Sequence, residues 1–259
     1  MAESIQEIKR ILQAADFERL PELFRIYEAD ERSGVVNEIK KAKKRLEAYE
    51  KEVERTENLK KYENEYASYT SICGIDEVGR GPLAGPVVAG AVILPKNCDI
   101  LYINESKKLS EKKRVELYDI IMEKAVAVGI GYSTPKRIDE INILQATYEA
   151  MREAVSKLSV VPDLLLNDAV TIPELPMKQV AIIKGDAKSI SIGAASIVAK
   201  VTRDRLMVEY DSIFPAYHFA SNKGYGAQAH IDALKQYGPC PIHRKSFITH
   251  FVDQMEEEH

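Results

Sequence analysis

The sequence SICGIDEVGRGPLAGPVVAGAVIL, residues 71–94, decides the fold of the chain. An apolar run leads into the acidic pair Asp76-Glu77, a glycine-rich segment with one arginine follows, and a second apolar run begins at residue 87. This pattern predicts two neighbouring strands joined by a sharp turn, with two carboxylates at the end of the first strand. An acidic pair is usually a solvated turn. Here three glycines between residues 79 and 85 favour a site, because glycine lets the backbone approach a ligand closely.

Composition narrows the class of protein. A chain of 259 residues can form one large domain, or one domain with an extension. Its formal charge of −4 argues against binding nucleic acid through bulk positive charge, although a local basic surface is compatible with it. The three cysteines lack the spacing of a zinc site or a disulfide framework. The first residues lack an apolar segment of the signal-peptide kind, so we expect a cytoplasmic protein without membrane association.

Residues 1–68 are rich in Glu, Lys and Arg and predict a helical extension. Ser4 and Glu7 have the spacing of a capping box for a first helix. A second helical segment, residues 36–66, carries apolar residues at alternating spacings of three and four, typical of a short coiled coil or a helical hairpin. These residues are Ile39, Ala42, Leu46, Tyr49 and Val53. A basic cluster at residues 40–45 favours a solvated helix face, because acids follow closely, and an auxiliary nucleic-acid contact is the alternative.

Residues 69–259 predict an α/β catalytic domain, including a C-terminal helical region. Strands are expected at residues 126–132, 164–168 and 179–183, in addition to the two described above. Helices are expected at residues 110–124, 142–158, 190–210 and 227–237, with a short helix after Thr134-Pro135. The acidic residues 256–259 are expected to form a mobile tail.

Three apolar strands of this domain lead into acidic residues: Asp76-Glu77, Asp168 and Asp186. If the strands are neighbours in one sheet, four carboxylates meet at one edge, which is unfavourable unless cations neutralise them. Oxygen ligands without His or Cys suit Mg²⁺ or Mn²⁺. Two such ions can activate water and stabilise the leaving oxygen of a phosphodiester. The pattern therefore predicts phosphoryl transfer on nucleic acid.

Six segments in order resemble the bacterial ribonuclease HII family, the type 2 ribonucleases H, over about residues 71–250. They are IDEVGRGPLAGPVVA, ESKKLS, KGDAKS, AASIVAKVTRD, NKGYG and IHRKSF. The resemblance implies a ribonuclease H-like α/β fold with a mixed central β-sheet flanked by helices, to which the N-terminal helical extension is added. It also implies endonucleolytic cleavage of RNA in RNA/DNA hybrids, and cleavage 5′ of single ribonucleotides in duplex DNA. The products would carry 3′-hydroxyl and 5′-phosphate ends, as in ribonucleotide excision repair.

The resemblance assigns roles to individual residues. The catalytic, metal-binding acids would be Asp76, Glu77, Asp168 and Asp186, and the cofactor Mg²⁺ or Mn²⁺. The segment Gly79, Arg80 and Gly81 would hold the ribonucleotide in the minor groove and read its 2′-hydroxyl, the group that distinguishes RNA from DNA. Tyr225 would stack on the sugar on the 3′ side of that ribose. Four residues would contact phosphate or the site, namely Lys107, Lys184, Ser189 and Arg244, with capping as an equal alternative for Ser189.

Several points stay open in the sequence. Glu105 stands where the family usually has Asp, and Asn167 precedes Asp168, where its side chain is expected on the opposite side of the strand. His230 and His243 are expected to be structural or to orient substrate, because metal-bound water needs no histidine. A non-catalytic nucleic-acid-binding module, a small-molecule metal phosphatase and a type 3 ribonuclease H that prefers longer hybrids are the rival functions. We expect a monomer whose partners are RNA/DNA hybrids and ribonucleotide-containing duplex DNA.

Overall fold

The structure is a computed structural model that describes residues 3–256, and the side chains of residues 3–251. The chain divides into two compact units, residues 1–58 and 59–259. In the described part of the chain, no helix is both long enough and apolar enough to cross a membrane. Residues 257–259 of the expected acidic tail lie outside the described residues.

The first unit is helical, as predicted. It contains α1 (Ile5–Ala14), α2 (Leu20–Tyr27) and most of α3 (Ser33–Leu59). The capping box is confirmed: the Ser4 hydroxyl accepts from Glu7 N at 3.2 Å, and Ser4 N donates to the Glu7 carboxylate at 2.7 Å. Helix α2 is absent from the expectations above because Pro21 looked like a breaker. Pro21 occupies the first turn of α2, where proline is tolerated.

The apolar face of α3 packs within this unit. Its residues Ile39, Ala42 and Leu46 join a small core, and Tyr49 stacks on Phe17 with ring centroids 4.0 Å apart. The rest of that core comes mainly from α1 and α2, through Ile8, Leu12, Leu20, Leu23 and Tyr27. The predicted seam is therefore the packing face of a three-helix unit.

One member of the predicted basic cluster is structural. The Arg45 guanidinium donates to the carbonyls of Leu12, Gln13 and Ala15 at distances of 2.8–3.0 Å. These groups lie at the end of α1, where the last carbonyls of a helix lack partners within the helix. Lys41 pairs with Glu38 at 2.7 Å. The exposed pair of Lys41 agrees with the solvated helix face that the sequence favours, whereas Arg45 caps α1.

The second unit begins with α4 (Lys61–Glu65) and is built on a five-stranded sheet of order β3-β2-β1-β4-β5. The central strand β1 (Ile72–Val78) pairs antiparallel with β2 (Val87–Ile93) and parallel with β4 (Leu164–Asp168). Strand β3 (Ala127–Ser133) is antiparallel to β2, and β5 (Lys178–Ile182) is parallel to β4. The predicted mixed sheet is confirmed, and the acid-bearing strands β1 and β4 are direct neighbours.

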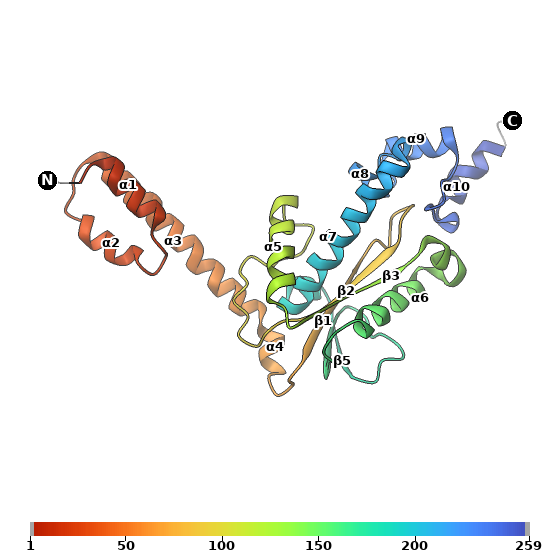
Figure 1. The fold of residues 1–259 in the computed structure, drawn as a ribbon, viewed down its shortest axis with the longest axis horizontal. Helices are drawn as coiled ribbons and strands as arrows, with labels where there is room; N and C mark the ends of the chain where they lie inside the picture. Colours follow the sequence, from red (N-terminus) through yellow and green to blue (C-terminus); the bar gives the residue numbers. More distant parts are fainter. Residues whose placement is uncertain (1–2, 257–259) are drawn as a thin grey trace. The chain divides into compact units, whose positions relative to one another are not determined.

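Two long helices cover the sheet. Helix α6 (Pro135–Ser156) packs on one face and α7 (Ile190–Ile213) on the other (Figure 1). Helix α6 bends at Asn142, whose φ of 70° is not helical, at the boundary predicted between a short and a long helix. The remaining elements are the helices α5 (Glu111–Lys124), α8 (Phe219–Asn222), α9 (Gln228–Tyr237) and α10 (Lys245–Glu256), with 3₁₀ turns η1 (Gly185–Ala187) and η2 (Pro215–Tyr217).

Glycines let both helices approach the sheet closely. A Cβ atom on Gly74 of β1 would lie 2.1 Å from the backbone of Ser191 in α7. A Cβ atom on Gly131 of β3 would lie 1.9 Å from the carbonyl oxygen of Ala150 in α6. Real Cβ atoms do not approach backbone this closely, so larger residues would push the helices away. The contact between Gly74 and Ser191 holds α7 directly over β1.

The close packing of α6 on β3 generates a stability prediction. We expect Gly131→Ala to lower the free energy of unfolding by about 2–3 kcal/mol, because the added methyl group overpacks a rigid backbone contact. Urea unfolding followed by circular dichroism measures this change. A matched control is Gly226→Ala, whose new Cβ would first meet the flexible end of Leu83 at 3.3 Å. Equal unfolding midpoints for the two variants would contradict the packing argument.

Candidate active site

The register of β1 and β4 brings two predicted acids together. Ile75 pairs with Asn167 in this parallel ladder, so Asp76 and Asp168 lie side by side one residue further on. Side chains alternate along a strand, so both acids lie on the face that also carries Gly74 and Leu166, which α7 covers. Asp186 follows in η1, directly after β5. Glu77 lies on the opposite side of β1 from Asp76, near the end of the strand.

One open cavity of about 380 Å³, a size typical of ligand pockets, is lined by all four acids. The segment Gly79, Arg80 and Gly81 also lines it, as does Tyr225. The remaining lining residues are Val78, Ser106, Lys107, Ser196 and Lys200. Residues separated by almost 150 positions in the sequence therefore share a single cavity.

The Asp76 carboxyl group is the most buried of the four acids, with 6% of the residue exposed. Burial raises its pKa well above the usual range, and the neighbouring carboxylates of Glu77 and Asp168 raise it further. A hydrogen bond with Ser196 and one from the Glu77 backbone N–H, at 2.8 Å, oppose this rise. A buried carboxylate beside other carboxylates favours either a bound proton or a nearby cation.

The pKa values of two further acids are raised for the same reasons. Burial raises the pKa of Glu77, although its ion pair with Arg80, at 3.3 Å, acts in the opposite direction. Burial also raises the pKa of Asp186, and repulsion from Asp168 and Glu105 adds to the effect. Like-charge repulsion therefore acts across the whole cavity.

The donor chemistry of the cavity fits hard divalent cations. All four acids offer oxygen ligands, and the raised pKa values of Asp76, Glu77 and Asp186 are those expected of buried carboxylates that a cation would stabilise. Within residues 3–251, no three His, Cys, Asp or Glu side chains are grouped so that they could hold one metal ion. Instead, Glu77 turns to Arg80, and Asp168 Oδ1 accepts from Gly185 N at 2.7 Å. Cations would have to compete with these contacts.

Arg244, predicted to contact phosphate or the site, is fully buried and contacts the backbone of the site. Its guanidinium donates to the carbonyl oxygens of Gly79, Arg80 and Gly85, at distances of 2.5–3.0 Å. Burial lowers its pKa to about 9. Arg244 therefore fixes residues 79–86, which we call the glycine turn, and main-chain carbonyls of this turn solvate its charge. A phosphate cannot reach it without opening this network.

A second buried arginine holds the same turn from α7. Arg203 donates to the carbonyls of Ala84 and Pro86 at 3.1 and 2.9 Å, and to Lys223 O at 2.8 Å. Gly79 requires its lack of a side chain here, since its φ is +92° and a Cβ would lie 2.3 Å from Arg203 Nε. The turn is thus shaped by buried cations and by a glycine that no other residue can replace without strain.

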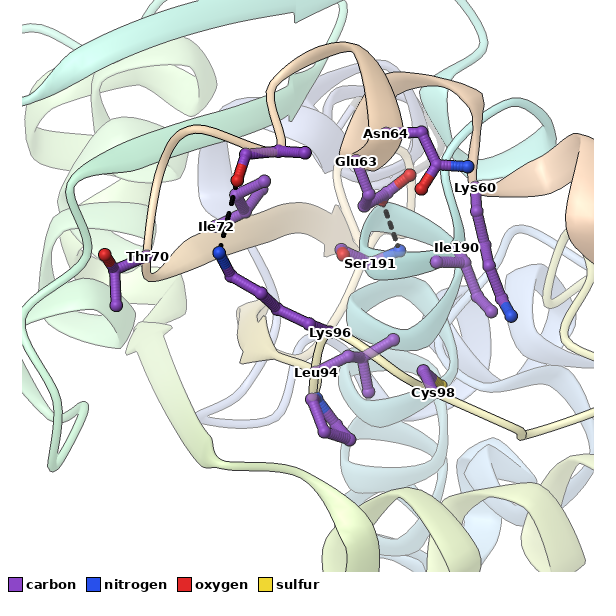
Figure 2. Close-up of a pocket in the computed structure, with 12 residues that line it drawn as sticks. Lys60, Glu63, Asn64, Thr70, Ile72, Leu94, Lys96, Cys98, Ile190 and Ser191 are labelled. Carbon is purple, nitrogen blue, oxygen red and sulfur yellow. Dashed lines mark hydrogen bonds between the residues drawn. The ribbon is translucent and has the colours of Figure 1, made fainter.

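Ser189 is also buried, and it caps α7, the role given above as the equal alternative to a phosphate contact. Its hydroxyl accepts from Ile192 N at 3.3 Å as the N-cap of α7, and donates to Glu63 Oε1 at 2.6 Å. Figure 2 shows Glu63 of α4 beside Ser191, whose N–H also donates to it at 3.0 Å. A carboxylate at the N-terminus of α7 is favourable because the helix dipole is positive there. This cap secures the start of the helix that follows Asp186.

The other predicted substrate contacts differ in their positions. Lys107 is exposed and lines the cavity, and its charge partly opposes the rise in the pKa of Asp186. Lys184 is exposed but lies outside the cavity lining, in a left-handed conformation with φ of 58° just before η1. Tyr225 is 46% exposed, and a Cβ on Gly81 would lie 3.8 Å from its ring. The tyrosine ring and Gly81 therefore lie next to each other in the lining of the cavity.

Sequence reasoning missed Ser196 and Lys200 as cavity residues. With Arg203 they recur at intervals of four and three along α7, a helix that is otherwise lined with small apolar residues. This spacing places them on one helix face and could have identified them. Ser196 lies 2.9 Å from the Ser106 hydroxyl, and Lys200 pairs with Asp204 at 2.6 Å. The polar stripe of α7 thus covers the acids.

The structure shows where Asn167 and Glu105, the two departures from the family pattern, are located. The Asn167 side chain is fully buried and donates to Gln179 Oε1 at 2.8 Å, on the side of β4 away from Asp168, as expected. Glu105 pairs with Lys108 and contributes to the raised pKa of Asp186. Asn167 is therefore part of the sheet structure, and Glu105 adds negative charge near the cavity.

Comparison with known proteins assigns the chain to a family. The model of ribonuclease HII matches residues 73–250, and the model of the ribonuclease HII N-terminal domain matches residues 4–67. The chain is 68% identical over 226 residues to ribonuclease HII from Lachnoclostridium phytofermentans, which covers 87% of this chain and 89% of that protein. It is 49% identical over 251 residues to ribonuclease HII from Clostridioides difficile, covering 96% and 98% of the two chains.

The fold gives the same assignment. The crystal structure of ribonuclease H2 from Pyrococcus horikoshii matches with a TM-score of 0.60 and 29% identity, over 73% of this chain and 98% of that chain. The fold class predicted from the sequence is therefore confirmed. The chain belongs to the ribonuclease HII family.

Proposed function

We propose that this protein, an endoribonuclease of the ribonuclease HII family that acts on RNA/DNA hybrids, cleaves at the cavity lined by Asp76, Glu77, Asp168 and Asp186. It would cut the RNA of such hybrids, and also 5′ of a single ribonucleotide in duplex DNA. The observation that carries the proposal is the shared cavity, in which the acids adjoin the glycine turn and Tyr225.

The family generally uses divalent metal ions. In our proposal two such ions, Mg²⁺ or Mn²⁺, are held by the four acids. When bound, they would supply an activated water and charge neutralisation at the leaving oxygen. The raised pKa values of Asp76, Glu77 and Asp186 support this assignment, because uncompensated carboxylates gain most from bound cations.

The protein's own residues would orient the substrate. Gly81 is exposed and has no side chain, so its peptide groups can approach a ribose 2′-hydroxyl. Arg203 and Arg244 fix the backbone of this turn, and a fixed turn selects one sugar position. Lys107 would attract the negatively charged backbone to the cavity. Tyr225 would stack on the sugar next to the ribonucleotide and so select the RNA–DNA junction.

Three further properties stay predictions. They are a functional division of the chain between residues 68 and 69, a monomeric state and a cytoplasmic location. The first is supported by the helical character of the N-terminal part and by the start of the sheet at Ile72.

We expect Asp76→Asn to lower kcat at least about a thousandfold on a duplex with one embedded ribonucleotide, because it removes a metal-binding charge. Gel analysis of nicking in Mg²⁺ measures this loss. In EDTA the variant should be more stable than the wild type, by about 1 kcal/mol or more, because a buried, repelled carboxylate has been neutralised. Denaturant unfolding thus shows that the loss is not misfolding. Full activity in this variant would refute the metal assignment.

Tyr225→Ala should lower the preference for a single embedded ribonucleotide over a continuous hybrid. We expect the ratio of the two kcat/KM values to fall about tenfold, because the stacked ring is lost. Tyr225→Phe is the matched control and should keep the ratio within about twofold, since it retains the ring. An unchanged ratio in Tyr225→Ala would contradict the stacking role.

A further inference from the structure

Two buried histidines lie next to the loop of residues 223–227, which we call the Tyr225 loop. His230 in α9 and His243, just before α10, are 0% and 4% exposed, and their Nε2 atoms are 2.9 Å apart. The rings of Tyr217 and Phe219 pack against both, with centroids 4.9–6.2 Å away. The pair is therefore sealed from the cavity, and its hydrogen bonds must be satisfied within the protein.

The partners at the outer ends of the pair fix the positions of its protons. Cys240 N–H donates to His243 Nδ1 at 3.0 Å, so this nitrogen is an acceptor without a proton. His230 Nδ1 lies 2.8 Å from the carbonyl oxygen of Tyr225, which can only accept, so this nitrogen carries a proton. In neutral rings, His243 Nε2–H must then donate to His230 Nε2. The result is a chain of hydrogen bonds that runs in one direction, from Cys240 to Tyr225.

The opposite direction fails at both ends. With the proton on His243 Nδ1, that nitrogen could donate to Cys240 O at 3.3 Å, but it would then oppose the Cys240 N–H. His230 would have to donate from Nε2, which would turn the lone pair of its Nδ1 toward Tyr225 O. Buried groups left unsatisfied in this way are costly. The Cys240 sulfur, 3.1 Å from His243 Nδ1, can donate to this nitrogen or accept from it, and therefore fits either direction.

A proton added to His230 Nε2 would break this chain of hydrogen bonds, because two N–H groups would then meet at the short contact between the rings. Burial lowers the pKa of both histidines, that of His243 to about 4. The titratable groups in contact with the pair are Tyr217 and Cys240, and burial raises the pKa of each, so both are neutral at pH 7. Arg244 follows His243 in the chain but directs its guanidinium to the glycine turn.

The end of this chain is the backbone of Tyr225. Its carbonyl accepts from His230 and also from Ala227 N, at 2.8 Å in each case. On the other side of the loop, Gly224 O accepts from Leu83 N at 2.8 Å, which ties the loop to the glycine turn. His230 therefore adds a side-chain contact at the Tyr225 carbonyl to the contacts that the backbone and the Asn222 side chain make within the loop.

We infer that His230 and His243 are positioning residues that set the junction preference of the enzyme by holding the Tyr225 backbone, without touching substrate themselves. The inference rests on the proposed role of Tyr225 as the ring that selects the junction. It assigns each histidine one tautomer, with the proton on Nδ1 of His230 and on Nε2 of His243. It also predicts that junction preference depends on the N–H group of His230 that donates to Tyr225 O, and not on the size of the imidazole ring.

Two substitutions at residue 230 separate the two ends of the ring. The side-chain nitrogen of Asn reaches the position of Nδ1, so His230→Asn can keep the donor to Tyr225 O. The side-chain amide of Gln reaches the position of Nε2, so His230→Gln keeps the contact with His243 and loses that donor. We expect His230→Gln to lower the kcat/KM ratio of single-ribonucleotide duplex to continuous hybrid by about three- to tenfold, and His230→Asn by less than about twofold. Equal losses in the two variants, or none, would overturn the inference.

The wild-type protein supplies a test that does not depend on folding of a variant. Long-range ¹H–¹⁵N spectra of the imidazole nitrogens at pH 7 should show the two assigned tautomers. The reverse tautomers, or a cationic ring, would overturn the hydrogen-bond chain whatever the activity of the variants.

A double variant separates this inference from the proposed function. In a Tyr225→Ala background, His230→Gln should not change the ratio further, because the ring that it positions is gone. A further fall would show that His230 acts by another route and would overturn the inference. If Tyr225→Ala alone leaves the ratio unchanged, the proposed role of Tyr225 fails, and the positioning of substrate specificity fails with it. The spectra still decide the hydrogen-bond chain in that case.

Discussion

Repulsion between carboxylates that the sheet forces together is the constraint on which the rest of the catalytic unit depends. The parallel pairing of β1 with β4 sets Asp76 beside Asp168, and neither acid can move away without breaking the ladder. Close packing of α7 on Gly74 then removes water from Asp76, which increases the electrostatic cost. The fold thus holds a charge arrangement that is unfavourable by itself and that divalent cations would relieve.

The buried arginines show how the protein places positive charge without giving it to the acids. Arg203 and Arg244 direct their guanidinium groups to main-chain carbonyls of the segment from Gly79 to Pro86. A salt bridge to Asp76 or Asp168 would neutralise the acids and compete with metal ions. Carbonyl partners satisfy the guanidinium donors while leaving the carboxylates available. The same contacts give the glycine turn a fixed shape.

The strands and the acids that follow them could be predicted from local pattern: apolar runs, turn residues and carboxylates. The mixed sheet was implied by the resemblance to the ribonuclease HII family. Burial decides roles that local pattern leaves open. Residue type alone could not say whether Arg244 contacts phosphate or the site, or whether Ser189 contacts phosphate or caps a helix, and only the packing shows both side chains to be enclosed. Ser196 and Lys200 were missed because their helix reads as apolar. Their position over the acids depends on the contact of α7 with β1.

In the proposed site, the catalytic acids and the sugar contacts are linked by a short stretch of chain. Asp76 and Gly79 are three residues apart, so a strand that fixes the carboxylate also fixes the start of the turn. Tyr225 comes from a distant segment and lacks this covalent constraint. Its loop is instead tied to the turn through Gly224 and Leu83, and to the interior through His230. The proposed cleavage next to one ribonucleotide requires a constant separation between the reacting centre and the sugar contacts. Here β1 sets the distance between Asp76 and Gly79, and hydrogen bonds of Gly224 and His230 hold Tyr225 in place.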